Sequence, residues 1–349
     1  MKSVAIVILV TLLAGCGMTD SEVKIKVQRF EDGPIIPPLL SKEIGTNVQG
    51  PSLIKIPGWV KSPLGKYYLY FADHKGHQIK LAYADNIKGP WKIRSGGTLL
   101  LENSLFLVDK PAIPKDFDVE SIKPRKAHPD LLPYIPKKID DLTIPHIASP
   151  DVHVDDKNKR IIMYFHGLDE FGLQKTRVAA SNNGLDFNVK KKIVGWPYFR
   201  KFTYKENDYA ISMPGVIYKN TGDIDDFTQV NQILEGNVRH SAVLVCKDQL
   251  LIFFTRKGDK PERILLSIVD LNMPSIMWKA SKVIEVLRPE KDWEGGNLPL
   301  YESTASAINT PVNQLRDPAI FVEEQEVYLL YSVRGENGIA IAKINIKGL

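Results

Sequence analysis

Short apolar runs separated by polar turns dominate this chain, and long stretches of helical periodicity are absent. Runs of four to seven apolar and aromatic residues alternate with turns rich in Gly, Asn, Asp and Lys. This alternation is typical of β-strands joined by tight connections. One phrase occurs twice: residues 239–243 (RHSAV) precede a polar turn and the apolar run 250–254, and residues 316–320 (RDPAI) precede a polar turn and the run 327–331. The chain therefore contains a repeated strand-turn-strand unit.

The same arrangement fits five segments of the chain, each with an inner strand, a hairpin, a middle strand and one or two outer strands. A unit of this kind cannot cover both faces of its sheet alone, so neighbouring units pack against one another. The sequence therefore predicts an all-β fold, a five-bladed β-propeller. The inner strands are expected to begin near residues 51, 149, 198, 239 and 316.

Two long segments interrupt the repeat. Residues 103–146 are rich in proline, which cannot donate to a sheet ladder, and residues 281–315 form the second segment. Long connections inside a compact domain are often functional. Because both lead into an inner strand, we expect them to wall one end of the central channel.

The N-terminus reads as a targeting segment. Residues 4–13 form an apolar run too short to span a bilayer as a mature helix. The run ends in LAGC at residues 13–16, which looks like a bacterial lipoprotein box with Cys16 as the lipidated residue; an ordinary secretory signal with an incidental cysteine is the alternative. We predict a signal peptide at 1–15, lipidated Cys16 with a tether at 16–30, and one propeller domain at 31–349. The predicted location is the bacterial cell envelope, lipid-anchored in the periplasm or outer membrane.

Composition adds few constraints. The 349 residues are 44% hydrophobic, which is ample for a large core. With Cys16 carrying lipid, Cys246 has no disulfide partner, and its apolar surroundings indicate a buried, inert thiol. The net charge of +5 comes without a basic stripe, so nucleic acid is not an expected partner. We expect a monomer that contacts the membrane only through its lipid.

Polar residues at the starts of inner strands should converge on the propeller axis. Carboxylate, imidazole and guanidinium groups gathered there would perturb one another's pKa values and permit acid–base chemistry. The alternative is that they pair with one another and close the channel. Polar residues after middle strands, such as His74 and Glu262, are weaker candidates. The converging set is Asp151, Arg200, His240 and Asp317, with His146, Arg239 and Arg316 beside them along the chain.

Several of these segments resemble the five-bladed glycoside hydrolases of family 43 and their relatives. They are residues 149–153 (SPDVH), 316–320 (RDPAI), 67–71 (YYLYF) and 81–91. The resemblance implies a carbohydrate substrate and no required cofactor, with a structural cation in the channel left open. In that family an Asp before a Pro in the first blade is the base, an Asp after a Pro in the second blade tunes the acid, and a Glu in the third blade is the acid.

This chain departs from the family pattern twice. The first blade has Gly50 before Pro51, and the third blade has Arg200 where a Glu is expected, so only Asp151 carries over directly. Because a glycosidase needs two carboxyl groups at the scissile bond, we predict Asp151 and Asp317 as the pair. The additional catalytic candidates are Glu294, beside a Trp and two glycines, and His240, which stands where its sister blade has Asp317.

Basic and aromatic residues near the same positions are candidates for substrate binding. Arginine forks suit a carboxylate or sulfate on a sugar, and an indole ring stacks on a sugar face. The histidines show no metal-ligand spacing, so no metal site is predicted. The predicted binding residues are His146, His166, Arg177, Arg200, Arg239, Arg316 and Trp293.

Three functions remain open at this point. The leading hypothesis is a glycoside hydrolase-like enzyme acting on a polysaccharide or oligosaccharide, including an anionic one. The second is a glycan-binding lipoprotein without catalysis, which the missing first-blade Asp favours. The third is a polysaccharide lyase that uses His240 as its base.

Overall fold

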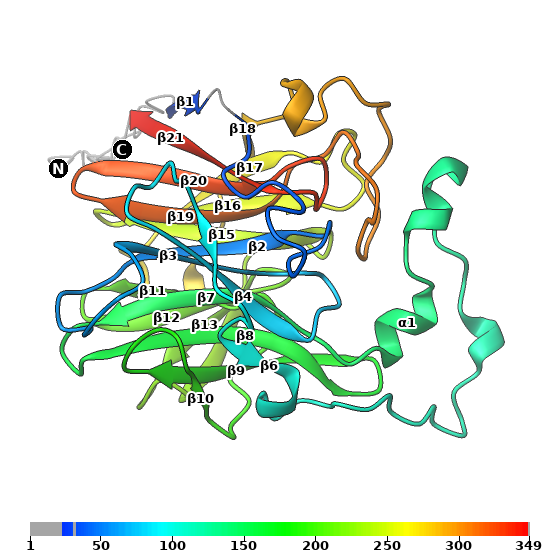
Figure 1. The fold of residues 1–349 in the computed structure, drawn as a ribbon, viewed down its shortest axis with the longest axis horizontal. Helices are drawn as coiled ribbons and strands as arrows, with labels where there is room; N and C mark the ends of the chain where they lie inside the picture. Colours follow the sequence, from blue (N-terminus) through cyan, green and yellow to red (C-terminus); the bar gives the residue numbers. More distant parts are fainter. Residues whose placement is uncertain (1–22, 31–32, 348–349) are drawn as a thin grey trace, which may run out of the picture.

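The structure is a computed structural model that describes residues 23–30 and 33–347. The predicted signal peptide and Cys16 lie outside the described residues. Strands account for most of the ordered elements, and Figure 1 shows them stacked as separate sheets. In the described part of the chain, no helix has the length and apolar character needed to cross a membrane.

Five antiparallel sheets form the blades of the propeller, which confirms the predicted fold. The first three blades follow one another along the chain. The first contains β2 (Gln49–Lys55), β3 (Tyr67–Ala72), β4 (Gln78–Ala84), β5 (Lys92–Ile93) and β6 (Leu99–Leu100). The second contains β7 (Ile147–Asp155), β8 (Arg160–Glu170), β9 (Leu173–Ser181) and β10 (Asn188–Val189). The third contains β11 (Arg200–Tyr204), β12 (Asn207–Ser212), β13 (Val216–Asn220) and β14 (Phe227–Gln232).

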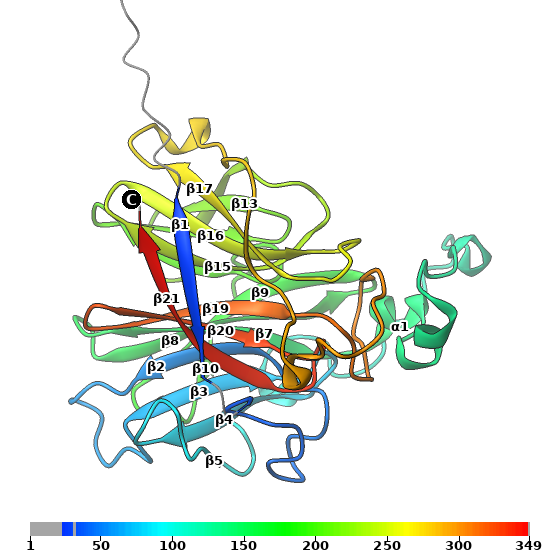
Figure 2. The same ribbon diagram turned by 90° about the horizontal axis from the view of Figure 1, so that it is seen from above.

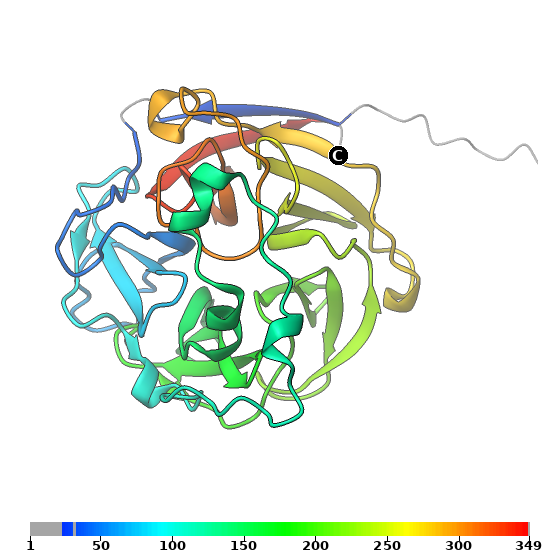
Figure 3. The same cartoon turned by 90° about the vertical axis from the view of Figure 1, so that its right-hand side faces the viewer.

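The last two blades bring the ends of the domain together. The inner strands surround the axis. β2 packs on β7 and on β19 (Arg316–Glu323), and β15 (Val238–Cys246) packs on β11 and on β19. Figure 3 shows the blades arranged around this axis. The fourth blade contains β15 (Val238–Cys246), β16 (Gln249–Arg256), β17 (Ile264–Asp270) and β18 (Ile284–Leu287). The fifth contains β19 (Arg316–Glu323), β20 (Glu326–Ser332), β21 (Ile339–Lys347) and β1 (Lys24–Arg29).

The ring of blades closes through the first strand of the chain. β1 pairs antiparallel with β21, from Lys24 opposite Lys347 to Arg29 opposite Ala342. Figure 2 shows β1 and β21 side by side. The prediction of a tether over 16–30 is therefore wrong for residues 24–29. β1 covers the edge of β21, whose backbone N–H and C=O groups would otherwise lack partners, and Ile25 and Val27 pack on the core between the fourth and fifth blades.

The hydrophobic core is divided among the spaces between neighbouring blades. Five clusters fill the five spaces; one, for example, joins Tyr70 of the first blade to Phe165 of the second. Burying one such side chain stabilises the fold by roughly 1.5–3 kcal/mol. The free Cys246 is half-buried against the cluster between the fourth and fifth blades. Each blade thus depends on its neighbours, as expected for a propeller.

The two long connections meet over one end of the axis. Tyr301 donates a hydrogen bond to Asp130 (2.7 Å), and the backbone N–H of Asn309 donates to Tyr134 (2.9 Å). Figure 3 shows residues 103–146 crossing in front of the channel. The segment 281–315 is not wholly a connection, since it contains β18. Short helices lie in or beside these loops: η1 (Leu101–Asn103), η2 (Val119–Ser121), η3 (Pro129–Tyr134), α1 (Lys138–Thr143) and η5 (Asp292–Glu294). One more, η4 (Ser275–Met277), lies between β17 and β18.

Candidate functional site

In four of the five blades a bulge lies at the start of the inner strand, at the end of the blade that faces the axial channel. The register shifts between Gln49 and Ser52 in β2, and the same shift occurs in β7, β15 and β19. In three blades the bulge holds a residue of positive φ before a proline: Gly50 (64°), Ser149 (51°) and Asp317 (49°). A non-glycine residue adopts this conformation only when its surroundings impose it. The bulge is therefore a built feature of the axis.

One residue near the start of each inner strand makes up a set that is here called the axial ring: Gly50, Ser149, Tyr198, His240 and Asp317. A side-chain carbon on Gly50 would come within 3.3 Å of Ser149 Cα. The rings of Tyr198 and His240 have centroids 3.9 Å apart, and His240 Nδ1 contacts Asp317 Oδ1 directly. The axial ring thus contains one carboxylate, Asp317, and one imidazole.

The axial ring corrects the predicted alignment of the blades. Asp151 and Arg200 were expected to match His240 and Asp317, but Ser149 and Tyr198 hold those places. Asp151 lies beyond the bulge, opposite Tyr164 in the β7–β8 ladder. Its carboxylate accepts a hydrogen bond from the backbone N–H of Lys201 (2.8 Å) and contacts His153 Nε2 (2.7 Å). The bulge sets two residues, Ser149 and Pro150, opposite the single residue Phe165, and Asp151 follows two positions after Ser149, which sequence comparison alone did not reveal.

Asp151 and Asp317 consequently do not share a cavity. Asp151 lines a cavity of about 330 Å³ formed by residues farther along the inner strands. Asp317 is completely buried beside His240, and its second oxygen accepts a hydrogen bond from Ser332 (3.2 Å). The predicted pair of carboxylates on one glycosidic bond is therefore wrong.

A large cavity lies at the start of the inner strands, below the two long connections. Its volume is about 580 Å³, and it is here called the axial cavity. Its walls combine cationic, amide and aromatic side chains from four blades and both connections. The lining includes His74, Lys75, Asp141, Gln174, Trp196, Tyr198, Met213, Gln229, Gln232, Arg239, His240, Lys257 and Ser306.

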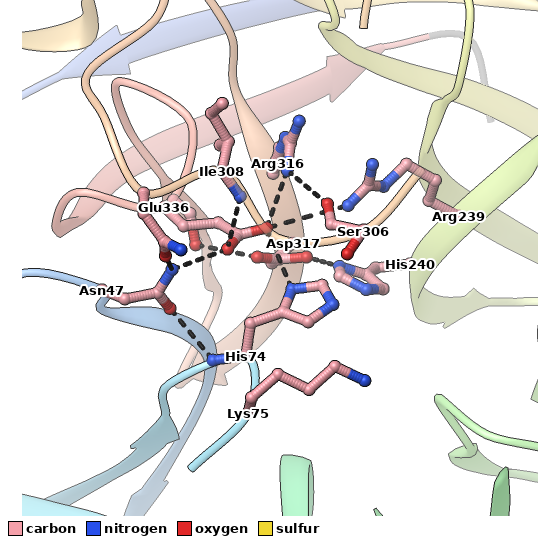
Figure 4. Close-up of polar contacts among 12 residues, drawn as sticks. Asn47, His74, Lys75, Arg239, His240, Ser306, Ile308, Arg316, Asp317 and Glu336 are labelled. Carbon is pink, nitrogen blue, oxygen red and sulfur yellow. Dashed lines mark hydrogen bonds and ion pairs between the residues drawn. The ribbon is translucent and has the colours of Figure 1, made fainter. Parts of the chain in front are cut away.

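A buried network of charged groups borders this cavity (Figure 4). Arg316 donates to Glu336 (2.7 Å), and His74 Nδ1 lies 3.0 Å from the same carboxylate oxygen. Glu262 lies 3.2 Å from Arg316 and 3.3 Å from Arg239. Burial opposes ionisation of Glu336, but His74, Arg316 and Arg239 outweigh it and hold its pKa well below the usual range. The two arginines and two glutamates thus balance one another.

Two of the predicted binding residues belong to this network but differ in their access to the axial cavity. Arg239 lines the axial cavity and donates to the carbonyl oxygen of Thr304 (2.7 Å). Arg316 is only 1% exposed and does not line the cavity. Arg316 therefore has a structural role beneath the cavity, and the structure does not place it where the predicted contact with substrate requires.

His240 is the group at the axial cavity best placed to exchange a proton. Burial, followed by the charges of Arg239 and His74, lowers its pKa, so its imidazole is neutral near pH 7. Asp317 is placed to accept the Nδ1 proton, which leaves Nε2 as the acceptor. A neutral histidine oriented by a buried carboxylate can serve as a general base.

Two further predicted histidines lie behind Tyr198. His166 has its ring 4.4 Å from that of Tyr198 and 5.9 Å from that of His146. Burial and the charge of Lys75 lower the pKa of His146 to about 3, and burial beside His146 lowers that of His166. Both are buried and neutral and do not line the axial cavity, so the structure gives them packing roles.

Two predicted arginines also lie outside the axial cavity. Arg200 donates to the carbonyl oxygens of Ser241 (3.0 Å) and Pro150 (2.9 Å), joining three blades. Arg177 pairs with Asp169 (3.1 Å) and lies over the ring of Phe106. Arg200 borders the smaller cavity, whereas Arg177 borders neither.

Glu294 and Trp293 were predicted to face a ligand, and both are placed elsewhere. Glu294 is completely buried, accepts a hydrogen bond from Arg29 of β1 (2.8 Å) and contacts the hydroxyl of Tyr331 (3.0 Å). Trp293 packs on the core between the fourth and fifth blades. Glu294 therefore fastens the closing strand, and the prediction of a catalytic role is wrong.

Sequence reasoning missed several residues of the axial cavity. Lys75 and Lys257, which line the cavity, and Glu336, which is buried beside it, follow the middle strands β3, β16 and β20. Loops after middle strands lie at the same end of a blade as the starts of inner strands, because neighbouring strands run antiparallel. That rule could have found them. Tyr198 and Trp196 were hidden because aromatic residues at strand ends are usually core.

Among the described residues, no group of three or more His, Cys, Asp or Glu side chains is arranged to hold a metal ion.

Comparisons with solved structures identify the class of fold. A thermostable family-43 glycoside hydrolase matches 87% of this chain and 93% of its own, with a TM-score of 0.51 and 12% identity. An endo-1,4-β-xylanase of Bacteroides thetaiotaomicron matches 90% of this chain and 96% of its own, with a TM-score of 0.53 and 11% identity. A Xanthomonas citri enzyme complexed with xylotriose matches 90% of this chain and 89% of its own, with a TM-score of 0.51 and 11% identity. The fold is thus the five-bladed propeller of family-43 glycoside hydrolases.

A closer relationship appears in sequence. The chain is 32% identical over 348 residues to the uncharacterized protein R118 of Acanthamoeba polyphaga mimivirus, covering 91% of this chain and 90% of that protein. The chain belongs to the family of this viral protein. No family model matches this chain.

Proposed function

We propose that this chain is a glycoside hydrolase-like enzyme that acts on a saccharide in the axial cavity, with His240 as the group that accepts a proton. One observation carries the proposal: His240, in contact with the buried carboxylate of Asp317, lines a large cavity on the propeller axis. The cavity volume of about 580 Å³ suits a short saccharide. The fold shared with family-43 enzymes supports the class of substrate.

The proposed mechanism uses a histidine where family-43 enzymes use a pair of carboxylates. Family enzymes place carboxylates in the first three blades, whereas Gly50, Ser149 and Tyr198 occupy the axial ring here. In hydrolysis the glycosidic C–O bond breaks, the hydroxyl of water joins the anomeric carbon, and its proton finally reaches the departing oxygen. His240 Nε2 would take that proton from the attacking water. Asp317 would stabilise the imidazolium that forms.

A second candidate is a glycan-binding protein without catalysis. The scarcity of carboxylates around the axial cavity favours this candidate. Among the described residues only Asp141 lines the cavity, and Asp141 already pairs with Arg125. Neither Gly50 nor Ser149 supplies the missing acid. Such a protein would keep the saccharide cavity and lack turnover.

The test compares wild type with His240→Gln and Asp317→Asn on a panel of polysaccharides. New reducing ends without ultraviolet absorbance identify a hydrolase, and an unsaturated, absorbing product identifies a lyase. We expect both variants to lose at least 100-fold in rate while binding is retained. Saccharide binding without product in wild type would establish the second candidate and overturn the enzymatic proposal.

We also propose that the protein is lipid-anchored in the cell envelope through Cys16. The support is the LAGC box behind an apolar run at the N-terminus. Radiolabelled palmitate should enter the wild-type chain, and Cys16→Ser should abolish the label and release the protein from the membrane fraction. Labelling that persists in the variant would refute the anchor.

A further inference from the structure

The walls of the axial cavity carry more cationic than anionic side chains. Lys75, Arg239 and Lys257 line it, whereas Asp141 is the one carboxylate that lines it in the described part of the chain. The three cations come from two blades, Lys75 from the first and Arg239 and Lys257 from the fourth. Figure 4 shows His74 and His240 between Lys75 and Arg239.

Lys257 has no carboxylate partner among residues 23–30 and 33–347. The nearby Asp259 pairs with Arg256 (3.2 Å) and Arg263 (3.4 Å) instead. Glu262 is held between Arg239 and Arg316. Burial, followed by the charge of Arg239, lowers the pKa of Lys257. The charge of Glu262 only partly opposes this effect, so the ammonium is a half-buried charge at the cavity wall with no carboxylate in ion-pair contact among the described residues.

Lys75 is only weakly compensated. Its ammonium lies 3.8 Å from Asp141, but Asp141 is in closer contact with Arg125 and accepts a hydrogen bond from Ser306 (2.8 Å). Burial lowers the pKa of Lys75, and the charge of Arg125 adds to this effect. An anion in the cavity would satisfy both lysines at once, and charge-assisted contacts of this kind are strong where water is partly excluded.

We propose that the axial cavity selects saccharides that carry an anionic substituent, a carboxylate or a sulfate, and that Lys75, Arg239 and Lys257 receive it. Trp196, 39% exposed and lining the same cavity, supplies an aromatic surface for a sugar ring. The inference rests on the proposed saccharide function and specifies its substrate class. The buried Glu336 does not oppose it, because Arg316, Arg239 and His74 already surround that carboxylate.

Calorimetric titration of the full-length chain tests the inference without requiring turnover. De-esterified oligogalacturonides are compared with their methyl-esterified forms, and sulfated carrageenan oligosaccharides with their desulfated forms. Within each pair the sugar backbone is the same, and the main difference is the anionic group. We expect the anionic member of one pair to bind at least tenfold more tightly, and its affinity to fall as salt is raised from 50 to 500 mM.

Variants locate the effect in the cavity. Lys257→Met and Lys75→Met should each weaken binding of the preferred anionic probe by roughly tenfold to a hundredfold, since a charge-assisted hydrogen bond is worth about 1.5–3 kcal/mol. Binding of the neutral form should fall by a smaller factor, because it has no charge for either ammonium to contact. Lys279→Met, an exposed site outside the cavity, is the matched control. Thermal melting of each variant shows whether it is folded.

The outcomes separate this inference from the proposed function. Equal binding of charged and neutral members, or lysine variants that bind like wild type, would overturn the anionic selectivity and leave a saccharide site in place. Failure of every saccharide in the panel to bind would overturn both. Selective binding of the sulfated or of the uronate member identifies which anion the three cations receive.

Discussion

The ring of Tyr198 packs against the ring of His240 with centroids 3.9 Å apart, where the third and fourth blades reach the axis. Tyr198 holds a positive φ of 61°, a conformation that a tyrosine adopts only when its surroundings impose it. Burial raises the pKa of its hydroxyl to about 12, so the side chain is neutral. Tyr198 and Asp317 therefore hold His240 from two sides, one by packing and one by charge.

This relationship predicts the effect of substitutions at Tyr198. Tyr198→Ala should remove the packing on one side of His240 and lower kcat by tenfold or more, with a loss of about 3 kcal/mol in unfolding free energy. Tyr198→Phe keeps the ring and should retain kcat within about threefold if packing is its role. Steady-state kinetics and urea unfolding measure both. A phenylalanine variant as inactive as the alanine variant would instead assign the hydroxyl a direct part in the reaction.

Stability should decline as the pH is lowered below the ordinary range of histidine. Burial lowers the pKa of His146 to about 3, whereas the unfolded chain takes up that proton near pH 6.5. The unfolded state therefore binds more protons between these values. As the pH is lowered through this range, the free energy of unfolding falls by at most about 1.4 kcal/mol per pH unit for this group. Urea unfolding from pH 7 to pH 4 measures the slope.

A substitution assigns the slope to that histidine. His146→Gln removes the titrating group and should make the decline shallower, while its stability at pH 7 is lower because the buried contact to the Ile144 carbonyl is altered. His128→Gln, at an exposed histidine, should leave the slope unchanged. An identical slope in the His146 variant and wild type would contradict the assignment.

Glu294 is expected to matter for stability and not for turnover. Glu294→Gln would leave Arg29 with only the exposed Glu290 as a carboxylate partner and would remove the charged partner of the buried Tyr331 hydroxyl, and we expect a loss of roughly 3–5 kcal/mol in unfolding free energy. The rate of the folded variant should match wild type. Glu290→Gln, which breaks an exposed pair with Arg29, should cost less than about 1 kcal/mol. A folded Glu294 variant that is inactive would return this residue to the catalytic candidates.

The closing strand gives a fourth prediction. Val27 faces the core between the fourth and fifth blades, so Val27→Asp should place a charge against apolar side chains and destabilise the protein by about 1–3 kcal/mol. Gln28→Asp, on the exposed face of the same strand, should change stability by less than about 0.5 kcal/mol. Chemical denaturation of both variants provides the comparison. Equal stability of the two would mean that β1 does not close the ring.

Much of the fold follows from local patterns. Apolar runs such as residues 67–71 and 250–254 form middle strands because each is buried on both sides by neighbouring blades. The phrase that occurs at 239–243 and 316–320 correctly marked two inner strands. The strand at residues 24–29 escaped notice because six residues with two aliphatic side chains on one face give a weak signal.

The site was only partly predictable. His240 and Asp317 were identified from the repeat, and the structure brings them into contact. Asp151 was misaligned because a bulge shifts the register without changing the apolar pattern around it. Glu294 looked like a ligand-facing residue because glycines follow it, yet Gly295 bends the chain so that Glu294 meets Arg29 from the opposite end of the sequence.

The sequence by itself determined the strands, their grouping into blades and the polar residues at the blade starts, because strand pairing within a blade joins residues close along the chain. Only the tertiary structure decided which of those residues meet. Closure of the ring brings Lys75 of the first blade to the same cavity as Lys257 of the fourth, and sets Gly50 beside Ser149 and His240 beside Asp317. Such contacts depend on packing around an axis and on the bulges, and neither leaves a local pattern in the chain.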